Sequence, residues 1–194
     1  MARKAVETEL SRERILYVAR DLFASQGYRT VSMRSIGKKL GYSHGALYYH
    51  FREKAELFYA LIVEDFSILR QMLNEVLTSH NGSGVSKVEQ VMLEFIRFGL
   101  EYRHHYEIMF LIGDPELQRY SRPEQVQCFE RFATVVREAT SEAAQNAIKE
   151  TNLSFLLFLS IHGFITHYIH SNRTYEEVTD KAKEHVKFLC RGLS

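Results

Sequence analysis

Residues that break helices are scarce along this chain. Its 194 residues include two prolines and ten glycines, whereas all-β folds need turn residues far more often. Hydrophobic residues make up 45% of the sequence, which is enough to bury a sizeable core. No segment of the sequence shows the two-residue alternation of a half-buried strand. The sequence therefore predicts an all-α fold of about nine helices.

The first 80 residues show clear helical spacing. Ser11 can cap a first helix and Gly27 can end it by accepting a left-handed conformation. A short helix follows Thr30, a third covers residues 44–50, and one long helix is expected from Glu53 to about Ser79. The apolar face of the first helix recurs three and four positions apart: Ile15, Val18, Ala19, Leu22 and Phe23.

Further helix starts are expected beyond the polar loop at residues 80–84. Ser86–Glu89 and Thr174–Glu177 both have the form of a capping box, in which the first and fourth side chains each accept a backbone N–H. Asp114–Pro115 and Ser121–Pro123 are two more predicted starts, because proline has no N–H to lose in a first helical turn.

Charge is distributed unevenly along the chain. Residues 1–54 contain eleven Lys and Arg against five Asp and Glu, whereas residues 55–194 contain fourteen against nineteen. A basic head on a mildly acidic body suggests that the head meets a polyanion, although ordinary surface charge explains the count equally well. We expect two domains, a head over residues 1–54 and a larger helical body over residues 55–194.

The basic head contains two short predicted helices joined at Leu40–Ser43, which is the arrangement of a helix-turn-helix. The segment Thr30–Lys54 closely resembles the DNA-binding signature of the tetracycline-repressor (TetR) family. The match extends over about residues 11–61 and includes the aromatic Phe23 and Gly27. The resemblance implies a three-helix head joined by a long helix to a body that binds a ligand and dimerises.

The resemblance implies phosphate contacts at five positions. Ser32 and Met33 match residues that meet the DNA backbone at the start of the second helix. Tyr49, His50 and Lys54 match positions that grip the backbone after the recognition helix. Tyrosine hydroxyls can donate to phosphate oxygens, and a lysine supplies a point charge.

Base contacts are implied at the recognition helix itself. Arg34 stands where some family members reach a base or a backbone group. His44, Gly45 and Tyr48 match the positions that face base edges, and Ser43 caps this helix beside them. A tyrosine ring can also pack on thymine methyl groups.

The aromatic residues around Tyr48 cannot all face a core. Leu47 and Phe51, four positions apart, are the natural core pair, so Tyr48 and Tyr49 are expected to point outward. The alternative is that Tyr48 packs on the first helix.

Aromatic residues are concentrated in the body, where the resemblance implies an effector pocket. Simple core packing is the alternative for each of them, but together they suit a mostly apolar cavity with a few polar groups. The predicted ligand-binding residues are Phe95, Phe98, Tyr102, Tyr106, Phe110, Phe129, Phe132, Phe158 and His162.

The last two predicted helices suit a subunit interface. Leu153–Ile169 is apolar nearly all round, which indicates burial on two sides, one of them by a second subunit. Val178, Ala182, Val186 and Leu189 form a narrow stripe of mostly small residues on the last helix. The resemblance implies that two such helices from each subunit form a four-helix interface in a homodimer.

Several other classes of site and location find no support in the sequence. Cys128 and Cys190 have no metal-binding or redox spacing, so two reduced thiols are expected. Of the late histidines, only His167 and His170 share a helical face, so neither a metal site nor a cofactor is predicted. The N-terminus is polar, and the most hydrophobic segment, residues 155–165, is too short to cross a bilayer. We therefore expect a cytoplasmic protein with no membrane contact.

These expectations combine into one functional hypothesis. The chain would be a ligand-responsive transcription regulator, a repressor that leaves a palindromic double-stranded operator when a small hydrophobic or aromatic effector binds. A DNA-binding protein without an effector is the main alternative. An enzyme is the remote one, because the sequence has no nucleophile elbow, phosphate loop or metal-protease spacing.

Overall fold

The computed structural model describes residues 9–79, 84–140, 152–171, 173–191 and 193. These residues form nine α-helices and one π-helical segment and contain no strand, which confirms the all-α prediction. The elements are α1 Arg12–Gln26, α2 Met33–Leu40, α3 His44–Leu47, α4 Lys54–Ser79, α5 Val85–Glu101, α6 Arg103–Tyr106, η1 Glu107–Leu111, α7 Pro115–Ala139, α9 Leu153–Tyr168 and α10 Tyr175–Cys190.

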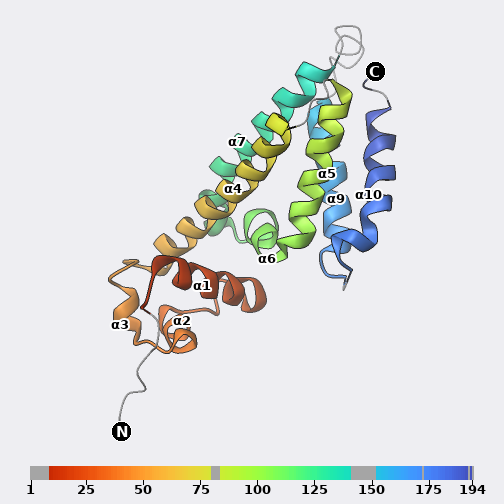
Figure 1. The fold of residues 1–194 in the computed structure, drawn as a ribbon. Coiled ribbons are helices and arrows are strands. Elements are labelled where there is room, and N and C mark those ends of the chain that lie inside the picture. Colours follow the sequence, from red (N-terminus) through yellow and green to blue (C-terminus); the bar gives the residue numbers. More distant parts are fainter. Residues whose placement is uncertain (1–8, 80–83, 141–151, 172, 192, 194) are drawn as a thin grey trace.

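The helices are arranged as a small head and a long body (Figure 1). Helices α1, α2 and α3 gather at one end, and α4 runs from them along the body. α4 packs beside α5 and α7, while α9 and α10 lie on the other side of α5. The short α6 and the segment η1 lie where the body meets α1.

Local signals account for how the head's helices begin and end. The Ser11 side chain accepts from the Arg14 backbone N–H and caps α1, as predicted. Gly27 follows α1 with a φ of 79°, and Gly41 ends α2 in the left-handed conformation with a φ of 81°. A side chain is strained in both places, so glycine suits them. The third helix is shorter than predicted, because residues 48–50 form a turn after α3.

Two of the predicted helix starts in the body are wrong. α5 begins at Val85 with Gly84 as its N-cap, so Ser86 and Glu89 lie inside the helix and form no capping box. Pro123 lies inside α7 and does not begin a new helix. Its missing N–H costs α7 one backbone hydrogen bond, and packing against α4, α5 and α9 offsets that loss. Asp114 and the Thr174 capping box begin α7 and α10 as predicted.

Three of the four residues of the stripe predicted on the last helix do not face a partner subunit, and the fourth, Leu189, is half-buried. Val178, Ala182 and Val186 are fully buried within this chain, because α10 packs along α5. A second subunit therefore has no access to them. Small side chains here allow close approach of two helices of one subunit.

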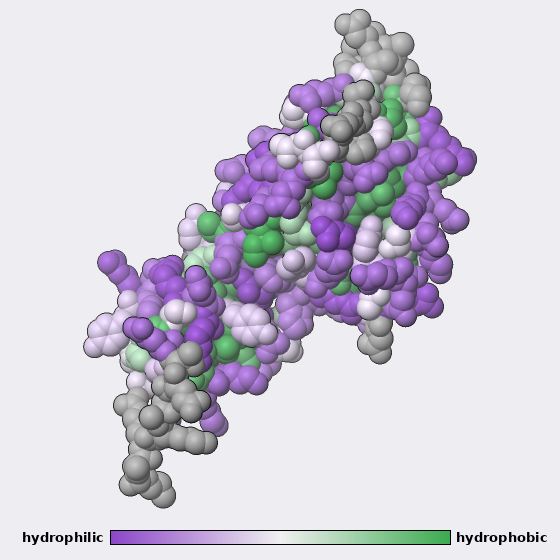
Figure 2. Space-filling model, in the orientation of Figure 1, coloured by the Kyte–Doolittle hydropathy of each residue, from purple (hydrophilic) through white to green (hydrophobic). Residues whose placement is uncertain are grey.

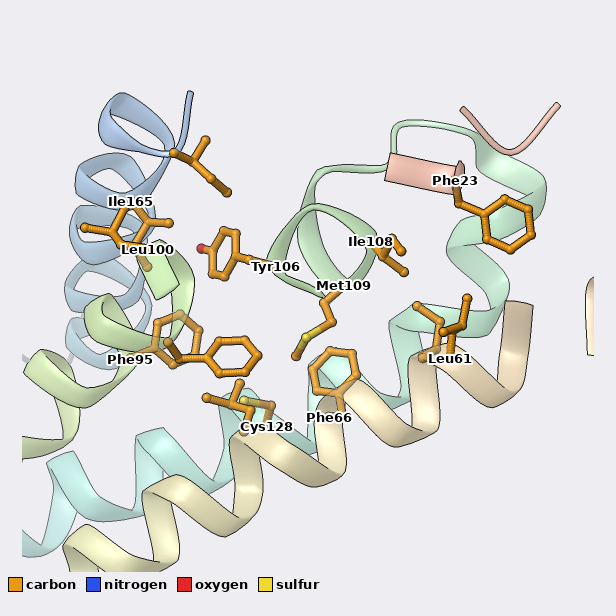
Figure 3. Close-up of a cluster of buried hydrophobic side chains, with 14 of the residues drawn as sticks. Phe23, Leu61, Phe66, Phe95, Leu100, Tyr106, Ile108, Met109, Cys128 and Ile165 are labelled. Atoms are coloured by element: carbon orange, nitrogen blue, oxygen red, sulfur yellow. The ribbon is translucent and has the colours of Figure 1, made fainter. Parts of the chain in front are cut away.

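One hydrophobic core runs through both the head and the body (Figure 3). Ile108 and Met109 of η1 are buried between the two parts. On the head side they approach Phe23 and Leu61, and on the body side the core continues through Tyr106 to Phe95. The head is thus packed against the body through α4, α6 and η1.

Candidate nucleic-acid interface and aromatic cluster

The helix-turn-helix is built from α2, a tight turn and α3. Ser32 and Ser35 form a capping box at the start of α2. Gly37 permits the close approach of the two helices, because a Cβ there would lie 3.0 Å from the Tyr42 carbonyl oxygen and 3.3 Å from the His44 backbone nitrogen. The turn therefore holds α3 firmly against α2.

The exposed side of this unit carries most of the predicted DNA-contact residues. Tyr48 and Tyr49 are 47% and 93% exposed, while Leu47 and Phe51 are completely buried, as predicted. The rings of His44 and Tyr48 meet edge to face with centroids 6.1 Å apart. The exposed set also includes Ser32, Arg34, Ser43 and Gly45.

Three of the predicted phosphate contacts are not freely exposed. The Met33 side chain is buried, so only its backbone at the start of α2 can meet DNA. The Lys54 ammonium group donates to the carbonyl oxygens of Tyr28 and Val31, both at 2.8 Å. His50 is half-buried, and its own carbonyl oxygen accepts from Arg12.

A buried ion cluster joins the head to the body. The Arg20 guanidinium of α1 donates to Asp65 of α4 at 2.7 and 3.0 Å and to Glu64 at 2.6 Å. Asp65 is completely buried, and Nδ1 of His105 from α6 lies 3.0 Å from its carboxylate. A surface pair of Arg29 with Asp114, 2.6 Å apart, also joins the head to the body.

Seven of the nine predicted ligand residues form one aromatic cluster in the body. The Phe158 ring contacts four phenylalanine rings and the His162 ring. Phe98 and Tyr102 are separate from it, because they stack on each other and lie beside His105. The aromatic cluster consists of Phe95, Tyr106, Phe110, Phe129, Phe132, Phe158 and His162.

Tyr106 and His162 provide the polar groups of the aromatic cluster. The Tyr106 hydroxyl lies 2.5 Å from Nδ1 of His162. Burial raises the pKa of Tyr106 well above its usual value and lowers the pKa of His162. At neutral pH a protonated phenol therefore faces a neutral imidazole, and the phenol can donate to it.

Open space lies beside the aromatic cluster and between the head and the body. A cavity of about 20 Å³, which holds about one water molecule, is lined by Phe132, Cys128 and Val91. A larger hollow of about 590 Å³ lies between α1 and the body and is lined partly by Tyr17 and His105.

Comparison with known proteins relates the head of the chain to one family. Residues 15–61 match the model of bacterial regulatory proteins of the tetR family. An HTH-type transcriptional regulator of Staphylococcus aureus strain MRSA252, SAR2658, is 31% identical over 94 residues, which is 48% of this chain and 50% of that protein. The chain thus spans about half the length of the curated relatives it matches. Residues 15–61, which contain the helix-turn-helix, are thus similar to the TetR family.

The likeness to solved TetR-family structures extends over almost the whole chain. PfmR of Thermus thermophilus superposes with a TM-score of 0.71 at 23% identity, over 96% of this chain and 99% of that one. AibR, solved in complex with isovaleryl coenzyme A and operator DNA, superposes with a TM-score of 0.72 at 16% identity, over 89% and 95%. At these identities the comparison shows that the fold is shared.

The buried ion cluster was not predicted from the sequence. A signal for it exists in the sequence, because Asp65 lies three positions after Ile62 and four after Leu61, on the apolar side of a long helix. A buried carboxylate needs a cationic partner, and Arg20 of α1 provides it.

In the described part of the chain, no group of three or more His, Cys, Asp or Glu side chains is arranged to hold a metal ion. No helix in the same described part of the chain is long and apolar enough to cross a membrane.

Proposed function

We propose that this chain is a transcription regulator that binds operator DNA through residues 1–54 and dimerises and senses a ligand through residues 55–194. The exposed face of α3 carries this proposal. It presents His44 on the helix and Tyr48 directly after it, while Leu47 on the other side is buried in the core. Such a helix can enter a major groove without disturbing the fold.

Each exposed residue suits a particular contact with DNA. His44 and Gly45 on α3, and Tyr48 directly after it, would face base edges, where their ring and backbone groups can donate, accept or pack on a methyl group. Tyr49 and the start of α2 at Ser32 would meet phosphates, which set the register of the protein on the duplex. Arg34 would serve either role.

An exposed apolar patch on α9 and α10 supports a homodimer. Phe155, Leu156, Leu159 and Phe188 are between 44% and 66% exposed. Ser160 of α9 contacts His185 of α10, three positions before Phe188, so the two helices that carry these residues pack together here. Figure 2 shows hydrophobic residues reaching the surface of the body. A two-fold interface on this patch would present two α3 helices to a palindromic operator.

The aromatic cluster supports a small hydrophobic effector. Its rings surround one hydrogen-bonding pair, Tyr106 and His162, which matches the mostly apolar character of ligand sites. AibR, which shares the fold, was solved with an acyl coenzyme A. An effector that favours one subunit arrangement would release the operator by a shift in population, as in a repressor.

A regulator without an effector is the second candidate. It is favoured by the tight packing of the aromatic cluster, in which Phe95 and Tyr106 are buried and the adjoining cavity holds about one water molecule. A ligand would then have to push these rings apart.

Tyr48→Ala should change the DNA sequence preference of the protein. An operator is first selected from a pool of random-sequence duplexes with the wild-type chain. We expect the variant to bind this operator with a loss of about 1–3 kcal/mol and to bind unrelated duplex DNA as before, because a base contact is lost and the phosphate contacts remain. Fluorescence anisotropy measures both affinities.

Tyr17→Ala is the matched control, because this exposed tyrosine of α1 lines the hollow beside the body. It should leave both affinities unchanged. If the wild-type chain enriches no duplex from the pool, the proposed DNA-binding function is wrong. If Tyr48→Ala keeps full preference, α3 is not the reading helix.

A bound effector should raise the melting temperature. Isovaleryl coenzyme A and free medium-chain fatty acids are the probes, and a binding probe at a hundredfold excess over its Kd stabilises the fold by about 2.7 kcal/mol. Tyr106→Phe should alter this shift because it removes the hydroxyl beside His162, whereas Tyr102→Phe, outside the aromatic cluster, should not. Stabilisation that Tyr106→Phe leaves intact would place the ligand elsewhere.

A further inference from the structure

Lys54 is the first residue of α4, and its side chain reaches back to the loop that joins α1 to α2. Its ammonium group lies 2.8 Å from the carbonyl oxygens of both Tyr28 and Val31. The same nitrogen lies 4.1 Å from the centre of the Tyr28 ring. Three groups of one loop therefore surround a single ammonium.

These contacts occupy the groups that a lysine would use on DNA. An ammonium has three N–H donors, and two of them point at main-chain carbonyls that would lack these bonds without it. The face of the Tyr28 ring also attracts the ammonium group through a cation–π interaction. Burial lowers the pKa of Lys54, in keeping with a side chain turned toward protein and away from solvent.

Arg12 makes a parallel contact at the other end of the helix-turn-helix. Nη1 of this α1 residue donates to the His50 carbonyl oxygen at 2.6 Å, and its guanidinium carbon lies 4.0 Å above the Phe51 ring. His50 closes the turn that follows α3. One cation thus holds the backbone before α2 and another holds the backbone after α3.

We propose that Lys54 and Arg12 are positioning residues of the DNA-binding head, which fix the loop before α2 and the turn after α3 through main-chain carbonyls. This inference rests on the proposed function and revises one part of it, the expectation that Lys54 contacts phosphate. The rigid unit between the two cations, with Ser32 at its start and Tyr49 at its end, then makes the phosphate contacts.

The salt dependence of operator binding separates positioning from phosphate contact. Lys54→Met keeps the aliphatic stem but removes the donors. We expect its operator affinity to fall at least tenfold, with the slope of log K against log salt unchanged. A lost phosphate contact would instead reduce that slope by about 0.9 unit. Arg34→Ala, on the exposed face of α2, serves as the comparison for a true loss of slope.

A readout without DNA keeps this test independent of the proposed function. In Lys54→Met, amide hydrogen exchange of residues 27–33 should accelerate at least tenfold and the melting temperature should fall. Lys54→Arg retains donors for both carbonyls and should restore slow exchange and affinity. Arg12→Met should accelerate exchange of residues 48–52 in the same way, and it provides the test if Lys54→Met does not fold.

Unchanged exchange in both methionine variants would overturn the proposal, and so would a slope that falls by about one unit in Lys54→Met. Failure of the wild-type chain to select any duplex would overturn the proposed function. The exchange measurements would still decide whether the two cations hold the loop and the turn.

Discussion

Replacing Asp65 with alanine should lower the free energy of unfolding by about 3–5 kcal/mol, the range for breaking a buried ion pair by removing one partner. Asp65 is completely buried and accepts two hydrogen bonds from Arg20, at 2.7 and 3.0 Å. Without the carboxylate, a guanidinium that is 9% exposed loses its main counter-charge. Glu64 remains as a partner, so the loss should lie toward the lower end. Urea denaturation of the purified chain measures it.

Matched variants show whether the charge or the packing is responsible. Asp65→Asn keeps the shape of the side chain but removes its charge, so it should also destabilise the fold. Glu64→Gln alters the solvent-facing partner of Arg20, which is 37% exposed, and should cost less than about 1 kcal/mol. If Asp65→Asn were as stable as the wild type, the ion pair would contribute nothing to holding the head on the body.

Leu159→Glu should convert the dimer to monomers and abolish operator binding. In a single subunit this side chain is 44% exposed, so a carboxylate there meets water and the subunit should stay folded. In a dimer on this patch two carboxylates would be desolvated without partners, which costs several kcal/mol and weakens association at least about a hundredfold. Sedimentation at micromolar concentration measures the mass, and circular dichroism checks the fold.

Two control variants test whether the effect of Leu159→Glu is specific to this patch. Tyr59→Glu places the same charge on an equally exposed residue of α4 and should leave the oligomeric state unchanged. Ala182→Glu, on the stripe that the sequence analysis assigned to the interface, should instead unfold the subunit, because Ala182 is completely buried against α5. A dimer that survives both Leu159→Glu and Phe188→Glu would place the interface on another surface.

The local sequence was sufficient to predict most of the helices and to predict which side chains around α3 are exposed. The spacing of Leu47 and Phe51 separates their buried side from exposed Tyr48 and Tyr49 whatever the rest of the chain does. Ser11, Gly41 and Thr174 mark helix ends because the hydrogen bonds and the positive φ involve only a few neighbouring residues. Pro123 shows where local sequence fails as a predictor. It was expected to begin a new helix, but α7 continues through it because the helix is held by packing.

The sequence by itself determined the helical fold, the basic helix-turn-helix and the concentration of aromatic residues in the body, because each depends on spacing and composition. Tertiary structure alone decided which partners the side chains meet. It placed the stripe of α10 on α5, joined Arg20 to Asp65 across 45 positions, and turned Lys54 onto carbonyl oxygens 23 and 26 positions earlier. Helical periodicity tells which face is apolar, but the choice between a neighbouring helix, a second subunit and DNA depends on how helices distant in sequence pack.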